Sequence, residues 1–171
     1  FVSNDYTQGK KVSVAIEREF RHCDAFYISV AFITEGGLAP LKQVLAELRD
    51  KGIPGKILTT SYLTFTEPKA LKTLADLSNV EVRVYDSTDE GASGFHTKGY
   101  IFKEEEIYRF IVGSSNMTAS AFSVNKEWNT KLVSTSDGEL LKQMMTEFNA
   151  LWNSKHTLAV KDFIEDYEVR Y

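Results

Sequence analysis

The feature of this sequence that most constrains its fold is a near-continuous apolar run from Ala25 to Ile33. Such a run is typical of a strand whose two faces are both covered by helices. Two more strand-like segments follow, one around Lys56 to Thr59 and one at the alternating valines 80, 82 and 84. Amphipathic helical patterns, from Leu38 to Leu48 and from about Pro68 to Leu77, separate these three segments. This βαβαβ order predicts parallel strands, whose C-terminal ends are where ligands gather in such sheets.

The second half of the chain has the pattern of an antiparallel hairpin. The segments His96 to Phe102 and Tyr108 to Val112 are strand-like, and the acidic residues Glu104 to Glu106 lie between them. We interpret the three acidic residues as a solvated turn rather than a metal site. A further strand is expected from Glu127 to Val133.

Helices are expected before the first strand, from about Lys10 to Phe20, and late in the chain, from about Asp137 to Trp152. Met144 and Met145 fall on the apolar face of the later helix, so we expect them in the core. The predicted fold class is therefore α/β, with a mixed, mostly parallel central sheet and helices on both faces.

The 171 residues fit one domain, which can bury about 70% of its unfolded surface. No linker or repeat divides the chain, so residues 1–171 are expected to form a single domain. Because Phe1 is not an initiator methionine, we expect this domain to be excised from a longer chain.

Composition excludes several classes of protein. The single Cys23 cannot form an internal disulfide, which makes a cytoplasmic location the default expectation. The longest apolar stretch is half of what a membrane-spanning helix needs. The net charge of −4 argues against a large surface that coats DNA without specificity, although a local basic patch would not change that total much.

Four polar residues stand out because of where they fall on the predicted hairpin. His96 and Lys98 lie on its first strand, and Ser114 and Asn116 lie on or just past its second. A spacing of two places each pair on one face. If the turn centres near Glu106, position 96 faces 116 and position 98 faces 114, with cross-strand Cβ distances of about 5 Å.

An imidazole, an ammonium, a hydroxyl and an amide on one patch suit a phosphate group. The cation neutralises phosphate oxygens, the amide and hydroxyl donate to them, and the imidazole can attack or transfer protons. Gly113 lies beside these residues, where the lack of a Cβ would let a substrate or another backbone approach closely. His22 and His156 lack such company, and we interpret them as structural or solvent-exposed.

These residues carry a family resemblance. His96-Thr97-Lys98 followed by Gly113-Ser114-Ser115-Asn116 resembles the HxK...GSxN signature of the phospholipase D superfamily. Glu127 is similar to the acid found at that place in the family's small bacterial nucleases and related restriction endonucleases. The loops Thr34 to Gly37 and Thr59 to Tyr62 are similar to those of phospholipase D-like domains found beside superfamily 2 helicases. The resemblance spans about Lys10 to Trp152 and implies the phospholipase D-like α/β fold.

The sequence departs from the family pattern in two ways. The family usually has an Asp five residues after the Lys, where this chain has Lys103, and the stretch from Lys98 to Gly113 is about three residues longer than usual. The chain also carries one copy of the motif, whereas the family's mechanism uses two histidines. The resemblance therefore implies a homodimer, in which a second copy supplies the second His96.

By this resemblance the reaction is metal-independent phosphodiester cleavage with no cofactor. His96 of one subunit would attack phosphorus and form a phosphohistidine, and the partner's His96 would protonate the leaving oxygen and then activate water. Lys98 and Asn116 would hold the non-bridging oxygens, and Ser114 would donate at the edge of the site. Glu127 would accept from the other imidazole nitrogen and so fix the tautomer.

The remaining expectations concern substrate and partners. We expect five residues to contact substrate: Gly113, Ser115, Thr60, Ser61 and Tyr62. The expected partners are nucleic acid, DNA first, a second copy of the chain and covalently attached helicase or restriction domains, with no membrane. Two alternatives remain open: a catalytically silent nucleic-acid-binding module, and a lipid phosphodiesterase, which should show an exposed apolar rim.

Overall fold

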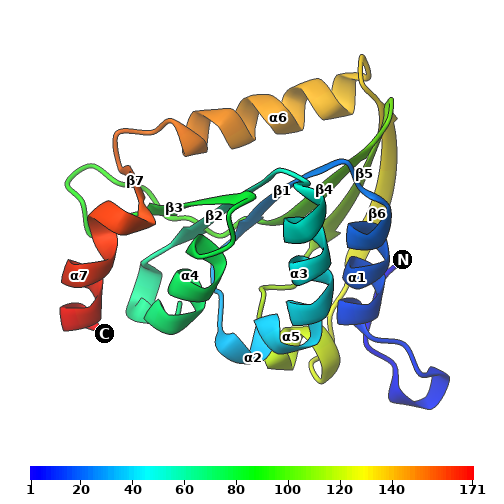
Figure 1. Ribbon diagram of the computed structural model, residues 1–171, viewed down its shortest axis with the longest axis horizontal. Coiled ribbons are helices and arrows are strands. Elements are labelled where there is room, and N and C mark those ends of the chain that lie inside the picture. Colours follow the sequence, from blue (N-terminus) through cyan, green and yellow to red (C-terminus); the bar gives the residue numbers. More distant parts are fainter.

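The apolar run that begins at Ala25 forms the central strand of a seven-stranded sheet in the computed structural model, which describes residues 1–171 (Figure 1). The strand order across the sheet is β6-β5-β4-β1-β2-β3-β7. The strands are β1 (Ala25–Val30), β2 (Gly55–Thr60), β3 (Val80–Tyr85), β4 (Lys98–Glu104), β5 (Ile107–Gly113), β6 (Asn129–Thr135) and β7 (Thr157–Ala159).

The sheet is mostly antiparallel, which corrects the prediction of a mostly parallel one. The βαβαβ unit does make β1, β2 and β3 parallel to one another. However, β4, β5 and β6 form an antiparallel meander, and β4 pairs antiparallel with β1. The short β7 adds one more antiparallel pairing, to β3. The two-residue turn favours the antiparallel pair of β4 and β5. The pairings of β4 with β1 and of β7 with β3 join segments far apart in the chain, and they make antiparallel pairings the majority.

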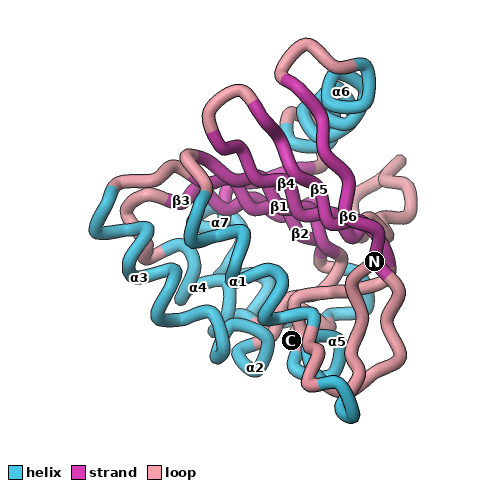
Figure 2. The backbone as a smooth tube through the Cα atoms, turned by 90° about the vertical axis from the view of Figure 1, so that its right-hand side faces the viewer, coloured by secondary structure: helices cyan, strands magenta, loops and turns pink.

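Helices cover both faces of the sheet, as predicted, but very unequally. Of the seven α-helices, α6 lies alone on one face, and α1, α2, α3, α4, α5 and α7 lie on the opposite face (Figures 1 and 2). None of the helices is long and apolar enough to cross a membrane. The helices are α1 (Val12–His22), α2 (Glu35–Leu38), α3 (Lys42–Lys51), α4 (Pro68–Ala75), α5 (Ala119–Ser123), α6 (Glu139–Trp152) and α7 (Val160–Arg170), with 3-10 turns η1 (Tyr6–Gln8), η2 (Ala39–Leu41) and η3 (Tyr62–Thr64).

The core lies mainly beneath the six-helix face. A cluster of 27 buried residues joins α1, α3, α4 and α7 to that side of the sheet. At its centre Phe20 of α1 makes edge-to-face contacts with Phe26 and Phe102, at ring distances of 5.0 and 5.1 Å. The α6 face holds two smaller clusters, of five and three buried residues. The large cluster therefore anchors the strands whose ends carry the polar residues described next.

The pairing of β4 with β5 is one residue out of the expected register. Glu104 pairs with Ile107, so Glu105 and Glu106 alone make the turn, and Glu105 has a left-handed φ of 55°. Gly99 consequently pairs with Val112, and the same register continues to Lys98 opposite Gly113. The expected pairings of 96 with 116 and of 98 with 114 are therefore wrong by one residue.

Candidate active site

His96 and Lys98 lie where the chain enters β4, at the edge of the sheet where β1 and β5 end. The Lys98 Nζ donates to the carbonyl oxygen of His96 at 3.0 Å. The His96 side chain is exposed, and its ring meets the edge of the Tyr62 ring at a centroid distance of 5.1 Å. The loop after β2 thus reaches the imidazole through Tyr62.

Asn116 is held in one orientation by the loop after β1. Its Oδ1 accepts a hydrogen bond from the backbone N–H of Phe32 at 3.1 Å. Because the carbonyl oxygen is engaged, the amide nitrogen carries the remaining donors and bonds to no group of the chain. Asn116 can therefore donate to an anionic ligand at this edge.

Glu127 binds two serine hydroxyls rather than the imidazole. Ser114 and Ser115 donate to the same carboxylate oxygen, Oε1, at 2.9 and 2.8 Å, and no hydrogen bond joins Glu127 to His96. Glu127 is buried, with 8% of the residue exposed, so these two donors compensate for the carboxylate's loss of water. Glu127 precedes β6, whose Asn129 pairs with Gly113, and this pairing brings the carboxylate to the turn after β5.

Two buried polar residues that the sequence interpretation missed support this turn. Asn129 donates from Nδ2 to the Ser115 hydroxyl at 2.9 Å, and Tyr100 donates to the Ser115 carbonyl oxygen at 2.9 Å. Burial, with the charge of Glu127 as a smaller cause, raises the pKa of Tyr100 well above its ordinary value. The available signal for Tyr100 was its place two residues after Lys98 on the same strand face.

Gly113 is needed for the approach of another backbone. A Cβ at this position would lie 2.2 Å from the carbonyl oxygen of Trp128 and 2.5 Å from Oδ1 of Asn129. Of the two possibilities that the sequence left open, the structure therefore shows the neighbouring strand rather than a cavity for substrate. Ser115 is likewise fully buried and offers its hydroxyl to Glu127 instead of to solvent.

The three residues expected to contact substrate in the loop after β2 separate into two groups. Thr60 and Ser61 are buried, and their hydroxyls donate to the Tyr85 carbonyl oxygen at 2.9 Å and to Asp86 Oδ1 at 3.0 Å. They shape the loop and do not line a cavity at the site. Tyr62, next to His96, is the one that the structure places at the candidate site.

The position usually occupied by the family's Asp lies far from this edge. Lys103 pairs with Tyr108 near the tip of the hairpin, at the opposite end of β4 from His96. The carboxylate of its neighbour Glu104 forms a salt bridge with the Arg109 guanidinium at 3.5 Å. Neither residue reaches the candidate site. No group of three or more His, Cys, Asp or Glu side chains is arranged so that it could hold a metal ion.

Two cavities flank the site residues. One, of about 660 Å³, lies on the six-helix side and is lined by Ser114, Asn116 and Glu127 together with the aromatic Phe32 and Phe65. The other, of about 470 Å³, lies beneath α6 and has Lys98 at its border. Lys98 thus borders one cavity and Asn116 borders the other, and His96 lines neither.

Several solved structures resemble this chain. NucT from Helicobacter pylori has 14% sequence identity and a TM-score of 0.65, over 92% of this chain and 95% of that one. Phosphatidylserine synthase from Haemophilus influenzae Rd KW20 has 17% identity and a TM-score of 0.65, over 95% of this chain. Polyphosphate kinase from Porphyromonas gingivalis has 10% identity and a TM-score of 0.60, over 86% of this chain. This chain spans 40% of the synthase and 22% of the kinase.

At these identities the structural likeness shows the fold, and family membership comes from the sequence. A comparison with curated proteins gave no match. The family model described as "Cardiolipin synthase, PLD-like domain" matches residues 24–152, which is most of the chain and contains every residue of the candidate site. The chain therefore belongs to the phospholipase D-like domain family.

Proposed function

We propose that this domain is a phosphodiesterase that cleaves nucleic acid through a phosphohistidine intermediate on His96. The observation that supports the proposal is that three suitable groups lie at the same end of neighbouring strands, where β4 begins and β5 ends. These are the exposed His96 imidazole, the Lys98 ammonium and the Asn116 amide with its donors unused. Together they provide a nucleophile, a positive charge and a hydrogen-bond donor for one phosphodiester group.

In the proposed reaction an imidazole nitrogen of His96 attacks phosphorus while the bond to the leaving oxygen breaks. Lys98 and Asn116 hold the non-bridging oxygens as negative charge moves onto them. A second imidazole protonates the leaving oxygen and then takes a proton from water, which attacks phosphorus and releases His96. Ser114 donates a hydrogen bond to Glu127 in the turn that carries Asn116. These two residues therefore act by positioning Asn116.

The second imidazole is proposed to come from another copy of the chain. His22 is exposed in α1 and His156 pairs with Asp89 at 2.8 Å, so neither offers a partner to His96. A two-fold dimer with both His96 side chains near its axis supplies the missing group. Sedimentation at micromolar concentration should show about twice 19.4 kDa, whereas a strict monomer with full activity would contradict this arrangement.

The function is tested with plasmid DNA in excess EDTA. We expect nicking that persists in EDTA and disappears in His96→Ala, because Lys98 supplies the cation that a metal would otherwise provide. His22→Ala is the matched control, since it removes a histidine that lies outside the site. Activity that requires added Mg²⁺ or Mn²⁺ would overturn the mechanism. We further propose that attached helicase or restriction domains present the DNA.

One observation favours a lipid substrate as a second candidate. Leu63 is 57% exposed and Phe65 is 55% exposed, and Phe65 borders the larger cavity. These two exposed apolar side chains support the apolar rim that a lipid phosphodiesterase would use for membrane contact. A parallel assay on phosphatidylcholine vesicles separates the candidates: lipid cleavage without DNA nicking would favour this second function. Absence of both activities, with retained DNA binding, would favour a silent binding module.

A further inference from the structure

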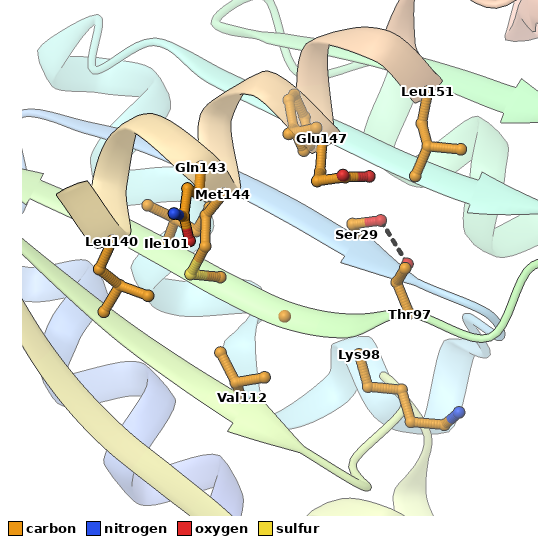
Figure 3. Close-up of a pocket in the computed structure, with 12 residues that line it drawn as sticks. Ser29, Thr97, Lys98, Ile101, Val112, Leu140, Gln143, Met144, Glu147 and Leu151 are labelled. Carbon is orange, nitrogen blue, oxygen red and sulfur yellow. Dashed lines mark hydrogen bonds between the residues drawn. The ribbon is translucent and has the colours of Figure 1, made fainter.

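The helix α6 and the sheet enclose a cavity instead of packing closely along their whole length. It has a volume of about 470 Å³ and lies between the helix and strands β1, β4 and β5 (Figure 3). Apolar side chains form most of its walls. They come from the sheet and from α6: Ile101, Val112, Leu140, Met144, Phe148 and Leu151. Met144 and Met145, which we expected in the core, are half-buried and pack against the Ile101–Phe110–Leu141 cluster, and Met144 also lines this cavity.

Small residues on the sheet make the space. Gly99 lies in the floor, and a Cβ built there would have no atom within 4 Å. Its φ is not left-handed, so the backbone does not require a glycine at this position. Beside it the hydroxyls of Ser29 and Thr97 bond to each other at 2.6 Å. A hollow of this size would close if position 99 carried a large side chain.

We propose that this cavity binds the base of the nucleotide next to the scissile phosphate. The inference rests on the proposed function and names its substrate more closely. Lys98, which we assign to the phosphate, borders the cavity and directly precedes Gly99. The Lys98 ammonium donates to the His96 carbonyl oxygen at the start of β4, so a phosphate held there lies beside the cavity rather than in it, and we place its adjacent nucleoside at the mouth. The volume lies in the range of small-ligand sites, which are mainly apolar with a few polar groups.

The polar residues of the cavity favour a base over an acyl chain. Gln143 and Glu147, both exposed, line the α6 side. Amide and carboxylate side chains form hydrogen bonds with base edges, and a carboxylate accepts from the amino group of cytosine. The negative charge of Glu147 also repels phosphate, so the phosphate stays at the Lys98 end and the base enters. A hydrocarbon chain would gain nothing from either group.

The first test fills the cavity. Gly99→Leu is compared with wild type on the dinucleotide dCpdC, which has one phosphodiester bond, and on its analogue with both bases absent. We expect kcat/KM on dCpdC to fall about tenfold or more, as for loss of contacts in an apolar pocket, with no change on the abasic analogue. Gly99→Ala should cause a smaller loss. Thr146→Leu, which adds bulk on α6 outside the cavity, is the matched control. Equal losses on both substrates would overturn the proposal.

The second test needs no catalysis. The chain has three methionines, of which Met144 lines the cavity and Met117 is buried elsewhere. With ¹³C-labelled methionine methyl groups, deoxycytidine monophosphate should shift the Met144 signal, while inorganic phosphate should not, and Gly99→Leu should abolish the shift. No shift with the nucleotide would overturn the base site. A Met144 shift with short-chain phosphatidylcholine instead would overturn it in favour of an acyl chain.

The two tests also separate this inference from the proposed function. Failure of the wild-type protein to cleave either dinucleotide, with a nucleotide-dependent Met144 shift, would overturn the phosphodiesterase and support the base site. Cleavage of both dinucleotides at equal rates by wild type would support the phosphodiesterase and overturn the base site.

Discussion

The two faces of the sheet differ in how completely they are covered. Six helices pack on one face and bury a continuous cluster of 27 residues. On the other face α6 alone covers two clusters of five and three residues, and strand β6 leaves Leu132, the neighbour of Phe110, 37% exposed. The difference indicates that one face supplies most of the stability of the domain. A cavity lies beside the site on each side of the sheet, and the one beneath α6 has the more apolar lining.

The candidate site lies on the edge that the two faces share. Tyr100 points into the six-helix side and supports the turn of Ser115, whereas Thr97 and Gly99 lie on the α6 side. Because side chains alternate along a strand, successive residues point to the six-helix face and to the α6 face. Mutations should accordingly separate into those that unfold the domain and those that change only its chemistry.

The largest expected effect is a loss of stability caused by a substitution on the six-helix face. Phe20→Ala removes a fully buried ring that contacts Phe26 and Phe102, and should lower the free energy of unfolding by about 3–5 kcal/mol. Urea denaturation monitored by circular dichroism measures this change. A loss no larger than that of the α6 variant described below would show that the two faces contribute equally.

The second largest expected effect is a loss of turnover without a loss of stability. Glu127→Gln keeps the shape of the side chain but removes the charge that accepts from Ser114 and Ser115, which position Asn116. We expect kcat to fall about a hundredfold, in the range for loss of one preorganised catalytic group. Steady-state kinetics and a urea curve are measured together. Glu90→Gln, at an exposed loop position, should match wild type in both, and a DNA-affinity defect with normal kcat would contradict this role for Glu127.

A smaller loss of stability is expected on the α6 face. Leu141 is buried in the three-residue cluster with Ile101 and Phe110. Leu141→Ala should cost about 2 kcal/mol, at the low end for such substitutions, because neighbouring side chains beside an open cavity can move into the space. The same urea experiment gives the value. A cost above that of Phe20→Ala would reverse the comparison of the faces.

The smallest expected effect concerns the reactivity of the Cys23 thiol, on the six-helix face. Burial raises the pKa of its thiol to about 12, so almost none is thiolate near neutral pH. We expect the native protein to resist an aromatic disulfide reagent at about pH 8 and to react once urea unfolds it. Rapid labelling of the native protein would mean that this face opens more easily than its packing implies.

Much of the fold could be predicted because the patterns are local. The apolar run at Ala25 and the amphipathic helices correspond to elements of the structure with small changes in their ends. The pairing of β4 with β1 could not be predicted, since it joins segments far apart in the chain. The short β7 was missed because three residues from Thr157 to Ala159 carry too little pattern to indicate a strand. The helix α7 was missed although Val160, Phe163 and Tyr167 recur at helical spacing.

The candidate site was predicted in composition more than in geometry. The register was wrong by one residue because Glu105 adopts a left-handed φ that neither Gly nor Asn announces in the sequence. Glu127 is present as expected, but the turn after β5 brings Ser114 and Ser115 to its carboxylate, and no local pattern encodes that arrangement. Side-chain partners depend on how strand ends turn, which the sequence specifies only through the whole fold.

The most direct test of the account is to trap the covalent intermediate. The purified domain is incubated with an oligonucleotide in excess EDTA and quenched in alkali, which phosphohistidine survives, and then examined by intact and peptide mass spectrometry. The account predicts a nucleotide-phosphate adduct on the peptide that contains His96, absent in His96→Ala and present in His22→Ala. Cleavage of the oligonucleotide without any adduct, and at an undiminished rate in His96→Ala, would contradict it.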